Sequence, residues 1–130
     1  MKHTVTTIQA MRDNKEIITM LTAYDYPTAK KVNDAGIDMI LVGDSCAMVV
    51  HGHPTTLTAT MDMMVLHCAA VARACDRTMV IADMPFGSFQ YSIEDTMKNA
   101  ARFITEAKAA VLWPFSTNPR WMRSRMSPGE

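Results

Sequence analysis

Two kinds of apolar pattern alternate along this sequence, and the alternation constrains the fold more than any other feature. Short runs of consecutive apolar, often β-branched residues recur, and segments with apolar residues three or four positions apart lie between them. Continuous runs of this kind are typical of strands covered on both faces, whereas the wider spacing is typical of amphipathic helices. The alternation therefore predicts βα units with right-handed crossovers and a parallel sheet.

Four βα units can be placed on the sequence. We expect strands at residues 17–23, 38–44, 78–83 and 109–113, and helices at residues 6–14, 27–35, 61–74 and 92–107. The first strand is expected to be covered on both faces. The last helix is expected to turn Ile93, Met97, Ala100 and Ile104 inward. Four such units amount to half of an eightfold barrel, so the predicted fold class is α/β, a partial (β/α)8 TIM barrel.

The chain changes character after the fourth expected strand. Pro114 and Pro119 bracket a stretch that cannot easily continue a regular element. Residues 120–130 are basic and poorly patterned, with three arginines and one tryptophan. We interpret them as a frayed tail in preference to a nucleic-acid patch. The predicted organisation is thus a half barrel at residues 1–112 and a divergent tail at residues 113–130.

The charge balance and the cysteines indicate which partners and which cellular compartment to expect. Thirteen basic residues balance thirteen acidic ones, so no net field draws the chain to nucleic acid or to anionic lipid. No apolar run approaches the roughly 18–20 residues that span a bilayer, and the first residues lack the apolar core of a signal peptide. The three cysteines form no C-x-x-C pair and are expected to be buried reduced thiols. We therefore expect a cytoplasmic protein with neither nucleic-acid nor membrane partners.

Aspartates stand at the ends of the second and third expected strands. Asp44 follows one apolar run and Asp83 closes the next. The carboxyl ends of parallel strands form the active-site rim in α/β folds, and two carboxylates there could hold one hard cation through oxygen. The alternative is that each aspartate only caps the following loop by accepting backbone N–H bonds. The residues alone leave both interpretations open.

Other polar groups of the rim have two interpretations each. Asp25 ends the first expected strand, but it also precedes Pro27 as a helix N-cap would. Tyr24 and Tyr26 flank Asp25 and either pack or line the rim. Ser45 is interpreted as a hydrogen-bond donor beside Asp44, because no G-x-S-x-G elbow surrounds it. Glycine-rich phosphate-binding patterns are also lacking.

Three histidines are candidates for ligand contacts. His51 and His53 have no sulfur or acidic partner at metal-ligand spacing, so a loop folded over a ligand is preferred to a zinc site. His67 lies within the third expected helix, and we interpret it as a core histidine bonded to backbone. From the residues alone, the sequence predicts a metal-dependent α/β site for a small anionic or carbonyl ligand, without choosing the reaction.

Four stretches together resemble the ketopantoate hydroxymethyltransferase family. They are Thr22–Tyr26, Leu41–Ser45, His51–Leu57 and Ala82–Phe86. Their order, their spacing and the intervening helices all match, over about residues 1–110. The resemblance implies a (β/α)8 barrel of the phosphoenolpyruvate/pyruvate type that assembles into homo-oligomers. It also implies transfer of a hydroxymethyl group from 5,10-methylenetetrahydrofolate to 3-methyl-2-oxobutanoate, giving 2-dehydropantoate.

The same resemblance implies roles for three residues. Asp44 and Asp83 would bind Mg2+ through their carboxylates. Ser45 and the Asp44 region would bind the keto acid, whose carboxylate and keto oxygens chelate the metal. The implied partners are therefore small molecules, a keto acid and a folate.

Several groups of the family are not matched. A lysine and a glutamate belong on the fourth strand, where this sequence reads Val111–Phe115. The general base is a glutamate of the second half of the barrel, which this sequence does not contain, so no catalytic residue is assigned. We hypothesise a truncated or frame-shifted product, and the alternative function is an inactive fragment or pseudoenzyme. An open sheet edge would leave it marginally stable as a monomer. A related Mg2+-dependent C–C lyase is disfavoured by the loop His51–Leu57.

Overall fold

The computed structural model describes residues 1–114, and the expected tail lies outside this range apart from its first two residues. The strands are β1 (Met20–Thr22), β2 (Met39–Val42), β3 (Met79–Met84) and β4 (Val111–Pro114). The helices are α1 (Val5–Asp13), α2 (Tyr26–Asp34), α3 (Cys46–Val49), α4 (Met61–Ala74) and α5 (Ile93–Thr105), with a 3-10 helix η1 (Thr56–Thr58). The expected loop after β2 therefore contains two short helices.

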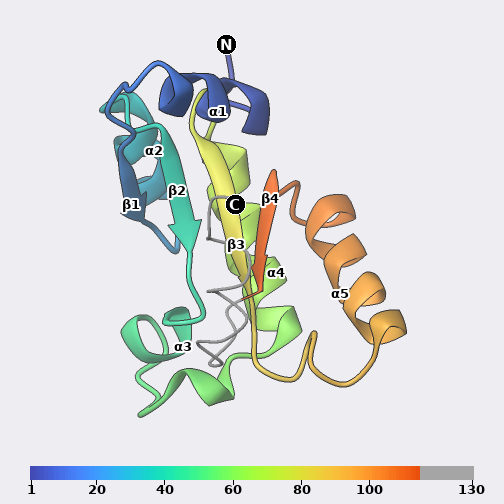
Figure 1. The fold of residues 1–130 in the computed structure, drawn as a ribbon. Helices are drawn as coiled ribbons and strands as arrows, with labels where there is room; N and C mark the ends of the chain where they lie inside the picture. The colour runs from blue at the N-terminus through green and yellow to red at the C-terminus, as the bar shows by residue number, and fades with distance from the viewer. Residues whose placement is uncertain (115–130) are drawn as a thin grey trace.

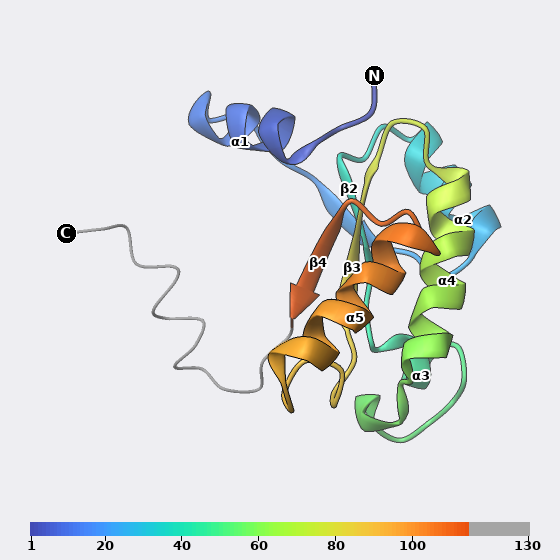
Figure 2. The same cartoon turned by 90° about the vertical axis from the view of Figure 1, so that its right-hand side faces the viewer.

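All four strands run parallel in the order β1-β2-β3-β4 (Figure 1). The layer of helices α2, α4 and α5 lies on one side of the sheet, whereas α1 lies near the opposite end of the strands from α3 (Figures 1 and 2). Consecutive parallel strands joined by helices are the βα units that the sequence predicts. The fold class is confirmed as a partial barrel of four units.

Helix caps fix the points at which the loops after the strands end. Asp25 accepts the backbone N–H of Thr28 at 2.9 Å and begins α2, in which Pro27 occupies the first turn. Ser92 accepts the backbone N–H of Asp95 at 3.0 Å and begins α5. Each cap satisfies an N–H that the helix itself leaves unpaired. The capping interpretation of Asp25 is thus confirmed.

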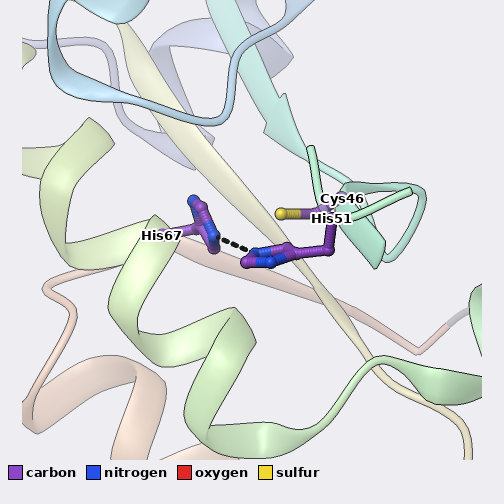
Figure 3. Close-up of side chains that lie close together, drawn as sticks. All are labelled: Cys46, His51 and His67. Carbon is purple, nitrogen blue, oxygen red and sulfur yellow. Dashed lines mark hydrogen bonds between the residues drawn. The ribbon is translucent and has the colours of Figure 1, made fainter. Parts of the chain in front are cut away.

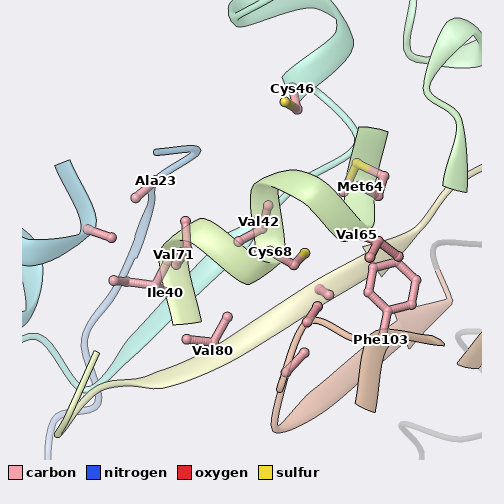
Figure 4. Close-up of a cluster of buried hydrophobic side chains, with 14 of the residues drawn as sticks. Ala23, Ile40, Val42, Cys46, Met64, Val65, Cys68, Val71, Val80 and Phe103 are labelled. Atoms are coloured by element: carbon pink, nitrogen blue, oxygen red, sulfur yellow. The ribbon is translucent and has the colours of Figure 1, made fainter. Parts of the chain in front are cut away.

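The core lies between α4 and the central strands. Ile40, Val42 and Val80 project from β2 and β3 toward Met64, Val65, Cys68 and Val71 of α4, with Phe103 of α5 beside them (Figure 4). The buried residues of α4 recur at three- and four-residue intervals, as expected of a helix with one apolar face. All six residues of β3 are buried, and this strand pairs with β2 at one edge and with β4 at the other.

The expected burial of the first strand is wrong. Only Met20–Thr22 form β1, and all three residues are exposed, with Met20 and Leu21 each 50% accessible. The physical reason is position, because β1 pairs with β2 alone and no further strand lies at its other edge within residues 1–114. An apolar run predicts that a strand is buried, but it does not show which element packs against it.

The inward face predicted for the last helix is also wrong. Ile93, Met97 and Ile104 are 84%, 65% and 59% exposed, whereas Phe103 is fully buried. Ala100 alone of the predicted set packs against the core. The i, i+3, i+7 spacing that selected Met97, Ala100 and Ile104 also fits a second face, and burial of the large Phe103 ring decides the rotation of α5. Within residues 1–114, none of the helices is long and apolar enough to cross a membrane.

Candidate functional site

The two strand-end aspartates meet at the rim of the sheet. Asp44 lies two residues beyond β2, and Asp83 is the penultimate residue of the neighbouring β3. The backbone N–H of Asp44 donates a hydrogen bond to Oδ2 of Asp83 at 3.1 Å. The structure thus places the Asp83 carboxylate directly against the Asp44 backbone.

Asp83 is a buried carboxyl group with unused bonding capacity. It is only 5% exposed, and its Oδ1 atom is buried with no hydrogen-bond partner among the residues that the structure describes. Burial is the main cause that raises the pKa of Asp83 to about 6; the hydrogen bond from the Asp44 N–H lowers the pKa, and the nearby Asp44 charge makes a smaller contribution that raises it. A buried, unpaired carboxylate oxygen is costly unless a proton or a cation satisfies it.

Asp44 is half-buried, and its surroundings raise its pKa as those of Asp83 do. Burial raises the pKa of Asp44, while hydrogen bonding to the Ser45 backbone and to the Thr56 side chain partly offsets this effect. Thr56 belongs to η1, so the loop after β2 folds back over the rim. Both carboxyl groups therefore favour a neutralising partner.

Gly43 permits the close approach of the groups around it. A Cβ atom at this position would lie 2.8 Å from Oγ of Ser45 and 3.4 Å from Oδ2 of Asp83. The first distance is shorter than side chains tolerate, so any larger residue would displace the Ser45 hydroxyl. The sequence interpretation did not single out Gly43, and only its position between a buried strand and Asp44 could have signalled its role.

A pair of hydroxyl groups, one of them from the segment after β1, also lies at the rim. Tyr24, which lies two residues beyond β1, places its hydroxyl 2.7 Å from Oγ of Ser45. Ser45 begins α3, but its side chain forms no cap with that helix. One hydroxyl donates to the other, and the second proton of the pair remains available to a ligand. Tyr24 is therefore at the rim, a placement that its sequence context left open.

The remaining aromatic and histidine candidates lie apart from the carboxylate pair. Tyr26 is half-exposed in the first turn of α2, and His53 is exposed in the loop. His67 is half-buried on α4, where its Nδ1 lies 2.6 Å from the backbone oxygen of Tyr24. The predicted bond of His67 to backbone is confirmed, although the residue is not fully in the core.

The donor set at the rim fits a hard divalent cation. Asp44 and Asp83 offer carboxylate oxygens from adjacent strands, and the unpaired Oδ1 of Asp83 is free to become a ligand. Mg2+ prefers oxygen ligands, commonly one or two carboxylates, and keeps the other positions for water and substrate. These residues therefore fit the ion that the sequence interpretation assigns to them.

Comparisons with known proteins agree on one family. The profile of the family described as ketopantoate hydroxymethyltransferase matches residues 2–113. A 3-methyl-2-oxobutanoate hydroxymethyltransferase of Staphylothermus marinus is 51% identical over 110 residues, which cover 85% of this chain and 40% of the relative. The enzyme of the same name from Desulforapulum autotrophicum is 53% identical over 109 residues, covering 84% of this chain and 41% of the relative.

Solved structures show the same fold. Two crystal forms of 2,3-dimethylmalate lyase, a PEP mutase/isocitrate lyase superfamily member, match with TM-scores of 0.61 and 0.62 at 20% identity. They cover 82% and 86% of this chain and 38% of the lyase chain. The chain thus spans about two fifths of the length of the curated relatives that it matches.

Proposed function

This chain belongs to the ketopantoate hydroxymethyltransferase family, and we propose that it contributes the metal and keto-acid site of a 3-methyl-2-oxobutanoate hydroxymethyltransferase. The reaction transfers a hydroxymethyl group from 5,10-methylenetetrahydrofolate to 3-methyl-2-oxobutanoate and yields 2-dehydropantoate, a step of pantothenate biosynthesis. One observation carries the proposal. The half-buried Asp44 and the buried Asp83, with its unpaired oxygen, lie together at the strand ends.

The residues of the rim have distinct parts in this proposal. Asp44 and Asp83 hold Mg2+ through carboxylate oxygens, and both must be ionised to do so. When bound, Mg2+ supplies a Lewis acid that polarises the keto oxygen of the substrate and acidifies the adjacent C–H. The hydroxyl pair of Ser45 and Tyr24 orients the keto acid by donating a hydrogen bond to it. Thr56, on the loop after β2, holds the Asp44 carboxylate by a hydrogen bond.

Binding of the keto acid tests the proposal without requiring turnover. Titration of the full chain with 3-methyl-2-oxobutanoate should show binding in the presence of Mg2+ and little binding after its removal with a chelator. Asp44→Ala should abolish the Mg2+-dependent part, because one of two protein ligands is lost. Asp95→Ala, which removes an exposed carboxylate of α5, is the matched control and should bind as the wild type does. Equal binding with and without Mg2+ would refute the proposal.

The same titration should depend on pH with a defined sign. Asp83, with a pKa of about 6, takes up a proton as the pH falls through that value, and a protonated carboxyl group cannot ligate the ion. We expect Mg2+-dependent affinity to be flat at neutral pH and to fall about tenfold per pH unit below about 6. Calorimetric titrations between about pH 5 and pH 8 measure this profile. A profile that stays flat to pH 5 would contradict the assignment of Asp83.

A second candidate function is an inactive member of the family. The observation that favours it is the sequence of β4, Val111–Pro114, which contains neither lysine nor glutamate. Such a chain would bind the keto acid but would not turn it over. An assay of the full chain with keto acid, Mg2+ and methylenetetrahydrofolate separates the two candidates, because only the first forms 2-dehydropantoate.

Two features of the intact protein complete the proposal. We propose that copies associate through apolar surface, which is supported by the exposed Ile93, Met97 and Ile104 on one face of α5. We also propose a cytoplasmic location. It is supported by the three cysteines, each of which is buried as a free thiol.

A further inference from the structure

A second group of metal-ligating side chains lies beside the rim. It comprises Cys46, His51 and His67, whose ligand atoms all lie within 4.8 Å of one another. Nε2 of His51 is 2.9 Å from Nε2 of His67, and the two rings meet edge to face at 80° (Figure 3). The thiol of Cys46 projects toward the same point in Figure 3. None of these three side chains has a part in the proposed hydroxymethyl transfer.

Two separate segments bring the cluster together. Cys46 begins the short helix α3, and His51 follows that helix, with its backbone N–H bonded to the carbonyl of Cys46 at 3.3 Å. His67 comes from α4, 16 residues further along the chain than His51. The sequence interpretation rejected zinc at His51 for want of a sulfur partner at metal-ligand spacing. That premise is wrong, because the turn of α3 supplies Cys46 and α4 supplies a second imidazole.

The ring of His67 is oriented as the ring of a metal ligand is. Its Nδ1 lies 2.6 Å from the backbone oxygen of Tyr24, and because a carbonyl only accepts, Nδ1 carries the proton and donates it. Nε2 of the neutral ring therefore presents its lone pair to the cluster. Metal-binding histidines characteristically donate their other N–H to a carbonyl or carboxylate, which fixes the tautomer and the ring orientation.

We propose that Sγ of Cys46, Nε2 of His51 and Nε2 of His67 form a Zn2+ site with an open fourth position. One thiolate and two imidazoles are ligands that Zn2+ prefers, whereas Mg2+ prefers oxygen. Three protein ligands leave the fourth tetrahedral position for water or for an added ligand. The inference does not rest on the proposed transferase activity, since it uses other atoms and another class of metal.

The two imidazoles need little rearrangement to admit the ion. Two nitrogens bound to one tetrahedral zinc at about 2.0–2.1 Å lie about 3.4 Å apart, so the present 2.9 Å separation must widen slightly. His51 is exposed and can turn outward, whereas His67 is held by Tyr24. The thiol proton of Cys46 passes to solvent when the thiolate binds. The bound ion would tie α3 to α4 and to the end of β1, beside Asp44 and Ser45.

Cobalt provides the direct test, because Co2+ occupies zinc sites and reports its ligands in its absorption spectrum. Titration of the full chain in excess Mg2+, which fills the carboxylate site, should give one equivalent of thiolate-bound Co2+ with a thiolate-to-cobalt charge-transfer band, and Zn2+ should displace it. Cys46→Ala should remove the band. His51→Gln, at an exposed position that leaves the fold intact, should weaken binding by more than the roughly 10–100-fold typical of outer-shell changes.

Two matched variants keep the test specific. His53→Gln changes a neighbouring exposed histidine outside the cluster and should leave the spectrum and the affinity unchanged. Asp83→Asn removes a ligand of the proposed Mg2+ site and should also leave the band intact, so failure of one site can be told from failure of the other. Absence of Co2+ binding, a spectrum without the charge-transfer band, or equal losses in His51→Gln and His53→Gln would overturn the inference.

Discussion

Asp83→Asn is expected to abolish Mg2+-dependent binding of the keto acid and, at the same time, to stabilise the metal-free chain. Binding is lost because a neutral amide replaces a buried anionic ligand. Stability is gained because the wild-type fold must bury the Asp83 charge at neutral pH. The amide oxygen can still accept the bond that the Asp44 N–H now donates to Asp83. Function and stability therefore oppose each other at this position.

The sign and size of the stability effect follow from the pKa. Asp83 has a pKa of about 6 in the fold, above the ordinary aspartate value of 3.8, so the folded chain holds this proton to higher pH than the unfolded chain does. Stability is thus highest below about pH 4 as far as this group is concerned, and it is lost as the pH rises to about 6. A difference of about two pKa units corresponds to roughly 3 kcal/mol at pH 7.

Urea denaturation of the metal-free chain at pH 7 and at pH 5 measures this effect. The gain from Asp83→Asn should be largest at pH 7 and should shrink at pH 5, where much of the wild-type carboxyl is protonated. Asp44→Asn is the matched comparison, because Asp44 is only half-buried and should yield a smaller gain while also losing Mg2+. A destabilised Asp83→Asn variant that retains Mg2+-dependent binding would remove Asp83 from the site.

Phe103→Ala is expected to cost about 3–5 kcal/mol of unfolding free energy, the range found for large-to-small changes of aromatic core residues. Phe103 is fully buried between α5 and the core around α4. Domains commonly have only about 5–15 kcal/mol of total stability. This one change should therefore remove a large share of the free energy of unfolding.

Met97→Ala is the matched control on the same helix. Met97 is 65% exposed, and alanine suits a helix at either position, so helix propensity does not separate the two variants. In the dissociated monomer, where its side chain is exposed, Met97→Ala should shift stability by no more than about 0.5 kcal/mol. Equal effects of the two changes in urea denaturation would show that α5 packs through the face that the sequence pattern predicted.

The periodicity of apolar residues and the polar residues at strand ends are the local patterns from which the elements and the site can be predicted. The limits of α4 agree with the prediction, because the helical spacing of its apolar residues marks the segment; in the structure Thr60 caps its start by accepting the N–H of Met63. β1 and α5 show where such reasoning stops. Burial of Met20 or Ile93 depends on which neighbour covers it, and periodicity records only that an apolar face exists.

The candidate site also contains some residues whose positions the sequence predicts and others whose contacts it does not. The neighbouring positions of Asp44 and Asp83 could be predicted, because a polar residue at the end of a buried strand has a defined place in a parallel sheet. Tyr24 gave no such signal, since its contact with Ser45 depends on the turn after β1. The approach of His67 to His51 was also hidden, because it depends on how α4 packs beside the loop after β2.

One measurement addresses the carboxylate pair most directly. Crystals of the full chain grown with Mn2+, as an anomalously scattering substitute for Mg2+, and with 3-methyl-2-oxobutanoate would locate the ion from its own signal. We expect a single anomalous peak for an ion bound to carboxylate oxygens of both Asp44 and Asp83, with the keto acid completing the coordination. A peak that touches only one of these carboxylates, or none at the rim, would contradict it.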